Sequence, residues 1–106
     1  MRISIERSGG FAGMTMRTAI DEKDLEPDEA QKLRRLVEKA NFFNLSKKIM
    51  ARSPRPDRFQ YELSLKESGR QHTVTMSEEA MPENLKPLVK WLMGKALQTK
   101  KSKESR

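Results

Sequence analysis

The sequence contains no cysteine and only one histidine among its 106 residues. Disulfide bonds and cysteine-based metal sites are therefore excluded, and a reducing compartment is favoured over secretion. The chain also has no long apolar run. Residues 1–7 lack the apolar core of a signal peptide, and no stretch reaches the length of a membrane span. We expect a cytoplasmic protein without a membrane segment. Export that does not use a leader peptide is left open.

Apolar residues make up only 35% of the chain, the same share as charged residues. A chain of this length and composition can bury one thin core and is too short for two domains with a linker. We expect residues 1–94 to form a single domain. Residues 95–106 contain five basic residues and one acidic residue without a periodic apolar face, which predicts a basic, disordered C-terminal tail.

Four segments alternate apolar and polar residues with the period of a β-strand. The first two lie around residues 3–5 and 14–20, and the three glycines between them predict a hairpin connection. The other two cover residues 59–65 and 72–76, with a turn at residues 66–70 between them. The sequence therefore predicts two antiparallel hairpins.

Helical spacing of apolar residues predicts two α-helices, one after each hairpin. The first begins at Pro27 and ends near Asn41, and the second begins between Pro82 and Pro87 and ends near Gly94. Residues 46–58 contain two prolines and read as an irregular loop. The order ββαββα predicts an α+β fold with a single antiparallel four-stranded sheet and both helices on one face.

The residues offer no catalytic constellation. His72 alternates with Val74 and Met76, so a half-buried structural histidine is favoured over a catalytic one. The glycines at residues 9–13 lead into a strand, whereas phosphate-binding loops lead into a helix, so a hairpin turn and a protein-binding role for Phe11 at its tip are about equally favoured. We expect no enzyme activity, no cofactor and no metal site of its own.

Basic residues between the first helix and the second hairpin raise the alternative of a small nucleic-acid-binding module, which would use Lys47, Lys48, Arg52, Arg55 and the tail. Aromatic stacking platforms are absent from that stretch, so nucleic acid is an unlikely partner. A third possibility is a structural subunit whose edge strand pairs with a second copy, which predicts a homodimer. We favour a monomer that binds another protein.

Three segments of the chain are informative together: MRISIERSGGFAG at residues 1–13, PDRFQYEL at residues 56–63 and PENLKPLVKWL at residues 82–92. In their order and spacing they resemble the emfourin family of protealysin inhibitors. This resemblance implies a noncovalent protein inhibitor of a thermolysin-like, zinc-dependent metallopeptidase of the protealysin kind. It also implies two neighbouring loops, of which one gives an aspartate to the zinc of the peptidase and the other gives apolar side chains to its substrate pockets.

Carried over to this chain, the resemblance implies Asp57 as the ligand of the peptidase zinc and Phe11 as the apolar anchor. The predicted protease-binding loops comprise Gly9, Gly10, Phe11, Ala12, Gly13, Met14, Pro56 and Arg58. Without the resemblance, an Asx turn after a proline would be the favoured interpretation of Asp57. Two alternatives stay open, in which Ile49 and Met50 supply the apolar contact or Asp21 or Asp24 supplies the carboxylate.

Overall fold

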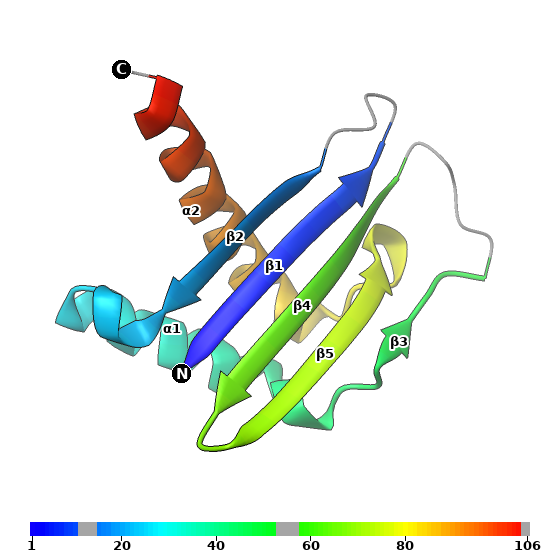
Figure 1. Ribbon diagram of the computed structural model, residues 1–106. Helices are drawn as coiled ribbons and strands as arrows, with labels where there is room; N and C mark the ends of the chain where they lie inside the picture. Colours follow the sequence, from blue (N-terminus) through cyan, green and yellow to red (C-terminus); the bar gives the residue numbers. More distant parts are fainter. Residues whose placement is uncertain (11–14, 53–57, 105–106) are drawn as a thin grey trace.

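The computed structural model describes residues 1–10, 15–52 and 58–104, with side chains up to Gln98. The described chain forms one sheet with two α-helices on one of its faces (Figure 1). The strands are β1 (Arg2–Gly9), β2 (Met16–Asp21), β3 (Lys48–Ile49), β4 (Phe59–Glu67) and β5 (Arg70–Ser77), and the helices are α1 (Pro27–Ala40) and α2 (Lys86–Glu104).

The strands of the described chain form a five-stranded sheet in the order β2-β1-β4-β5-β3. The pairs β1/β2 and β4/β5 are antiparallel, as the two predicted hairpins require. The hairpins are joined by the antiparallel pair β1/β4, whereas β3 lies parallel to β5. The prediction of an antiparallel four-stranded sheet is therefore wrong, and the α+β class is confirmed. Strand β3 has only two residues, too few to show an alternating pattern in the sequence. It is held beside β5 by backbone pairing, in which the amide of Thr75 donates to the carbonyl of Lys47 at 2.8 Å.

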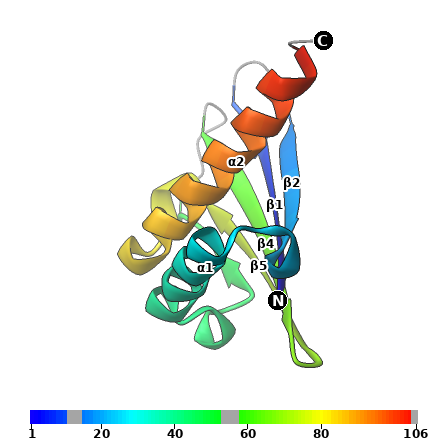
Figure 2. The same cartoon turned by 90° about the vertical axis from the view of Figure 1, so that its left-hand side faces the viewer.

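Both helices cover the same face of the sheet, as the edge-on view in Figure 2 shows. On that face the inward-pointing residues of three strands are fully buried: Ile3, Ile5, Leu63, Leu65, Val74 and Met76. The opposite face carries the alternating polar residues, among which Ser64 and Thr73 join their hydroxyl groups at 3.0 Å. The strand period of the sequence thus separates a core face from an uncovered face.

Helix α1 follows its local sequence signals closely. Pro27 occupies the first turn, and Asn41 ends the helix in the left-handed conformation with φ of 51°. Its buried face consists of Leu33, Val37 and Ala40. The predicted bounds of this helix are therefore confirmed.

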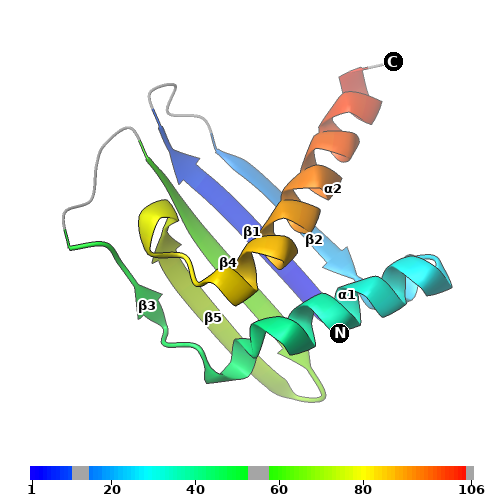
Figure 3. The same ribbon diagram turned by 180° about the vertical axis from the view of Figure 1, so that it is seen from behind.

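Helix α2 continues past Gly94 to Glu104, so the predicted end near Gly94 is wrong. Ala96 is only 6% exposed, and Lys95 forms an ion pair with Glu29 of α1, which gives the helix partners beyond the glycine. A glycine inside a helix costs only about 1 kcal/mol relative to alanine, which such contacts can offset. Figure 3 shows α2 running obliquely across β1 and β2, with its C-terminal end beyond the β2 side of the sheet. Neither described helix is apolar enough over its length to cross a membrane.

Candidate functional site

One end of the sheet brings the anchors of the two predicted binding loops together. Gly9 at the end of β1 lies directly opposite Phe59 at the start of β4. This pairing places the residue that follows β1, Gly10, beside the residue that precedes β4, Arg58. Figure 1 shows the end of β1 and the start of β4 side by side. We call this end of the sheet the loop edge, formed by Gly9, Gly10, Met16, Arg58 and Phe59.

The two glycines of the loop edge allow its strands to approach closely. Both have positive φ, 94° at Gly9 and 78° at Gly10. A Cβ atom at Gly9 would lie 2.9 Å from the carbonyl oxygen of Arg58, and one at Gly10 would lie 2.9 Å from the ring of Phe59. Side chains larger than hydrogen are therefore excluded at both positions unless the start of β4 moves.

Arg7 contacts the loop edge from within the core face of the sheet. Its Nη2 donates a hydrogen bond to Sδ of Met16 at 2.8 Å, and its Cζ lies 4.2 Å from the centroid of the Phe59 ring. Burial raises the pKa of Tyr61 on β4, and the neighbouring guanidinium of Arg7 lowers it to a smaller extent. A single side chain of β1 thus joins β2 and β4.

Two glutamates that follow β5 hold the start of β4. Oε1 of Glu78 accepts a hydrogen bond from the backbone amide of Phe59 at 3.1 Å. The guanidinium of Arg58 lies 3.7 Å from a carboxylate oxygen of Glu78 and 3.8 Å from one of Glu79. On the other side of residues 53–57, the amide of Ala51 donates to the hydroxyl of Ser77 at 2.8 Å. Both ends of this segment are therefore anchored on the end of β5 and the turn that follows it.

Three of the predicted binding residues, Gly9, Gly10 and Arg58, lie at the loop edge. The others lie outside the described residues, and their roles stay predictions: Phe11, Ala12, Gly13, Met14, Pro56 and Asp57. Arg7, Phe59 and Glu78 were not predicted as site residues. One signal in the sequence could have indicated Arg7. It follows Ile3 and Ile5 at the strand period, so a charged residue occupies a position of the inward face.

The residues considered as alternatives for the apolar contact and for the carboxylate differ in their position relative to the loop edge. Ile49 packs against the core, whereas Met50 is 40% exposed and lies close to the anchored Ala51. Asp21 is the last residue of β2, at the opposite end of the sheet from the loop edge, and its carboxylate accepts a hydrogen bond from the amide of Lys23. Asp21 is therefore poorly placed to act together with residues that flank Gly9 and Arg58.

The basic stretch is exposed where the structure describes it, at Lys47, Lys48 and Arg52. Arg55 and the side chains of the tail lie outside the described residues. Lys48 belongs to β3, and its neighbour Ile49 packs against the core, so this stretch is tied to the sheet edge. A nucleic-acid role for it stays an untested alternative.

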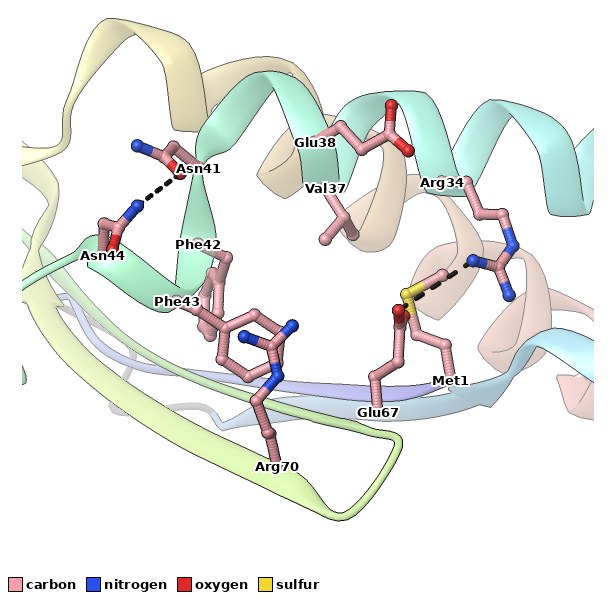
Figure 4. A pocket seen from close by; sticks show the side chains of 10 residues that line it. All are labelled: Met1, Arg34, Val37, Glu38, Asn41, Phe42, Phe43, Asn44, Glu67 and Arg70. Carbon is pink, nitrogen blue, oxygen red and sulfur yellow. Dashed lines mark hydrogen bonds and ion pairs between the residues drawn. The ribbon is translucent and has the colours of Figure 1, made fainter.

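A cavity of about 340 Å³ lies at the other end of the sheet, between α1 and the β4–β5 hairpin (Figure 4). Three of its charged groups have partners of their own, since Arg34 lies 4.0 Å from Glu67 and Arg70 lies 4.1 Å from the centroid of the Phe43 ring. The ion pair between Arg34 and Glu67 reduces the charge available to an ionic ligand. We regard this cavity as structural.

Within residues 1–10, 15–52 and 58–98, no group of three or more histidine, aspartate or glutamate side chains could hold a metal ion. His72 is half-buried, and its Nε2 lies 2.7 Å from the carbonyl oxygen of Leu45. Its ring packs edge-on against Phe42 with the centroids 5.7 Å apart. The prediction of a structural histidine is therefore confirmed.

The fold and the loop edge define a small α+β protein in which the end of β1 and the start of β4 lie side by side at one end of a helix-covered sheet, an arrangement suited to binding through the residues that adjoin these strands. The emfourin family model matches residues 5–93, so this chain belongs to the emfourin family. Membership of this family confirms the prediction that this chain is not an enzyme.

Among solved structures, the chain is similar to emfourin (M4in) from Serratia proteamaculans, described as an M4 family peptidase inhibitor. The two share 20% sequence identity over 88% of this chain and 87% of that one, with a TM-score of 0.48. No curated protein sequence matches this chain significantly.

Proposed function

We propose that this protein is a noncovalent inhibitor of a thermolysin-like zinc metallopeptidase of the protealysin kind. Membership of the emfourin family over residues 5–93 carries this proposal. The emfourin of Serratia proteamaculans is described as an inhibitor of M4 family peptidases. The partner is therefore a peptidase of that class, which meets the inhibitor in the cytoplasm or after export.

In the proposed mechanism, Asp57 ligates the zinc of the peptidase and Phe11 fills a hydrophobic subsite of its cleft. A catalytic zinc keeps one position open for water, and a carboxylate from a second protein can occupy that position. With the water displaced, the peptidase lacks its nucleophile. No bond between the two proteins other than metal coordination is needed, so inhibition is reversible.

The geometry of the loop edge supports a joint action of the two segments. Gly9 and Phe59 are paired residues of neighbouring strands, and only Gly10 stands between Gly9 and the segment that contains Phe11. Arg58, adjacent to Asp57 in sequence, is held by Glu78 and Glu79. Anchors that are ordered before binding lower the entropy lost on association.

The test is a titration of the protein into a thermolysin-family peptidase that cleaves a small peptide substrate. Asp57→Asn keeps the size of the side chain and removes the charge that favours zinc, and Phe11→Ala removes the apolar anchor. Each should raise Ki by roughly 30-fold or more, the loss expected for a hot-spot residue at an interface. Asp28→Asn, a matched change at an exposed position in the first turn of α1, should leave Ki unchanged.

Inhibition that survives both Asp57→Asn and Phe11→Ala would contradict the proposed mechanism. If the parent protein inhibits none of several protealysin-like peptidases and instead binds an oligonucleotide with an affinity that falls steeply with salt, the nucleic-acid alternative replaces the proposed function.

A further inference from the structure

Arg7 is a charged side chain on the face of the sheet that the helices cover. It follows Ile3 and Ile5 in the inward alternation of β1, and it is only partly buried. It lines an open groove of about 630 Å³ beside α2, together with Tyr61 and Leu97. A guanidinium in such a position needs partners, and all of its described partners belong to the strands that flank β1.

Two of these partners, Met16 and Phe59, lie directly after the two proposed binding segments, each at the start of the strand that follows. Met16 begins β2 and therefore marks the far end of the segment that starts at Gly10. Phe59 begins β4 and marks the end of the segment that contains Asp57. Arg7 donates to Sδ of Met16 at 2.8 Å and stacks on the Phe59 ring with its Cζ 4.2 Å from the centroid.

We propose that Arg7 is a positioning residue that holds the start of β2 and the start of β4, from which the two protease-binding segments extend, in one arrangement. The proposal rests on the proposed inhibitory function of the loop edge. Arginine suits this role because its planar guanidinium can stack on a ring and donate in its own plane at the same time. The stacked ring of Phe59 is also the surface against which Gly10 packs, so Arg7 acts on Gly10 through Phe59.

The first experiment measures Ki for Arg7→Gln, Arg7→Lys and the control Arg17→Gln, with circular dichroism confirming the fold of each. Arg17 is an exposed arginine of β2 that pairs with Glu6, so its replacement changes the net charge equally without touching the loop edge. Arg7→Gln should raise Ki about tenfold, since it removes a stacked cation and a hydrogen bond. Arg7→Lys keeps the charge but not the planar group, so we expect an intermediate value.

A double-mutant cycle separates positioning from direct contact with the peptidase. If Arg7 acts through Phe59, the variant that combines Arg7→Gln with Phe59→Leu should lose less inhibition than the product of the two single losses. Losses that multiply would show that Arg7 contacts the peptidase itself, and an unchanged Ki for Arg7→Gln would show that it has no part in inhibition. Either result overturns the proposal.

Amide hydrogen exchange of the uncomplexed protein gives a readout that does not depend on any peptidase. Exchange at Gly10 and Met16 should be faster in Arg7→Gln than in the parent and in Arg17→Gln. Unchanged exchange at these amides overturns the role of Arg7 even if the protein is an inhibitor. Absence of inhibition by the parent, with faster exchange in Arg7→Gln, overturns the proposed function instead and leaves Arg7 as the residue that orders the loop edge.

Discussion

Gly10 packs against the ring of Phe59 so closely that a Cβ atom at Gly10 would lie 2.9 Å from Cε1 of that ring. The close approach joins the residue after β1 to the first residue of β4. It is possible because Gly10 adopts a φ of 78°, which other residues adopt only with strain. The close approach of the end of β1 to the start of β4 therefore depends on the absence of a side chain at Gly10.

Gly10→Ala should weaken inhibition about tenfold, because the new methyl group displaces the Phe59 ring and the segments that it aligns. Gly69→Ala is the matched control, since Gly69 has the same φ of 78° and its Cβ would meet nothing within 4 Å. Each substitution should lower the free energy of unfolding by about 1 kcal/mol through backbone strain. Ki values and urea denaturation curves for both variants test this, and equal Ki values would contradict it.

Glu78→Ala should raise Ki by about threefold to tenfold, because it removes the acceptor of the Phe59 amide and one ion-pair partner of Arg58. Glu79→Ala removes only an exposed ion pair with Arg58, which contributes little in water. Its Ki should therefore stay within about twofold of the parent value. Titration of both variants against the same peptidase makes the comparison, and a larger effect at Glu79 would mean that the hydrogen bond to Phe59 is unimportant.

His72→Ala should lower the free energy of unfolding by about 1–3 kcal/mol without changing Ki. The substitution leaves the carbonyl of Leu45 without its ring partner and removes the edge-on contact with Phe42. Gln71→Ala, at an exposed neighbouring position, serves as the control in urea denaturation. Loss of inhibition in a folded His72→Ala protein would assign this histidine a role in binding that its position does not indicate.

The stability of the protein should fall at alkaline pH through the titration of Tyr61. Burial raises the pKa of this phenol in the folded state above the value of about 10 of an unfolded chain. The folded state therefore retains the proton where the unfolded state releases it, so the free energy of unfolding decreases as the pH rises above about 10. Tyr61→Phe should lack this part of the decrease.

Two measurements check the alkaline prediction. Tyr61 is the only tyrosine of the chain, so phenolate absorbance reports its titration directly. Urea denaturation of the parent and of Tyr61→Phe at about pH 9 and about pH 11 gives the difference in stability, in which the titration of the lysines common to both proteins cancels. A difference that does not change with pH would show that the phenol titrates alike in the folded and unfolded states.

The elements that the sequence predicted correctly are those with local signals. Helix α1 has a proline at its start, an apolar stripe along its length and Asn41 at its end. The second hairpin has alternating residues on both strands, and Ser68 and Gly69 both take positive φ in its turn. Such signals depend only on residues that are close together in the chain, so these elements can be predicted from the sequence alone.

The elements that the sequence missed depend on residues far away in the chain. Strand β3 forms because Thr75 offers its amide to Lys47, and α2 passes Gly94 with Ala96 buried and Lys95 paired with Glu29. The local sequence pattern of residues 46–49 and of residues 94–98 does not predict these contacts. Local propensity was overruled there by tertiary contacts.

For the candidate site, the sequence by itself determined the composition, the strand and helix periods, and the three segments that resemble the emfourin family. The tertiary structure decided that Gly9 pairs with Phe59, that Arg7 joins Met16 to Phe59, and that Glu78 holds the start of β4. The physical reason is the order of the strands. β4 pairs with β1 across roughly 50 intervening residues, and no periodicity within either strand encodes which partner it takes.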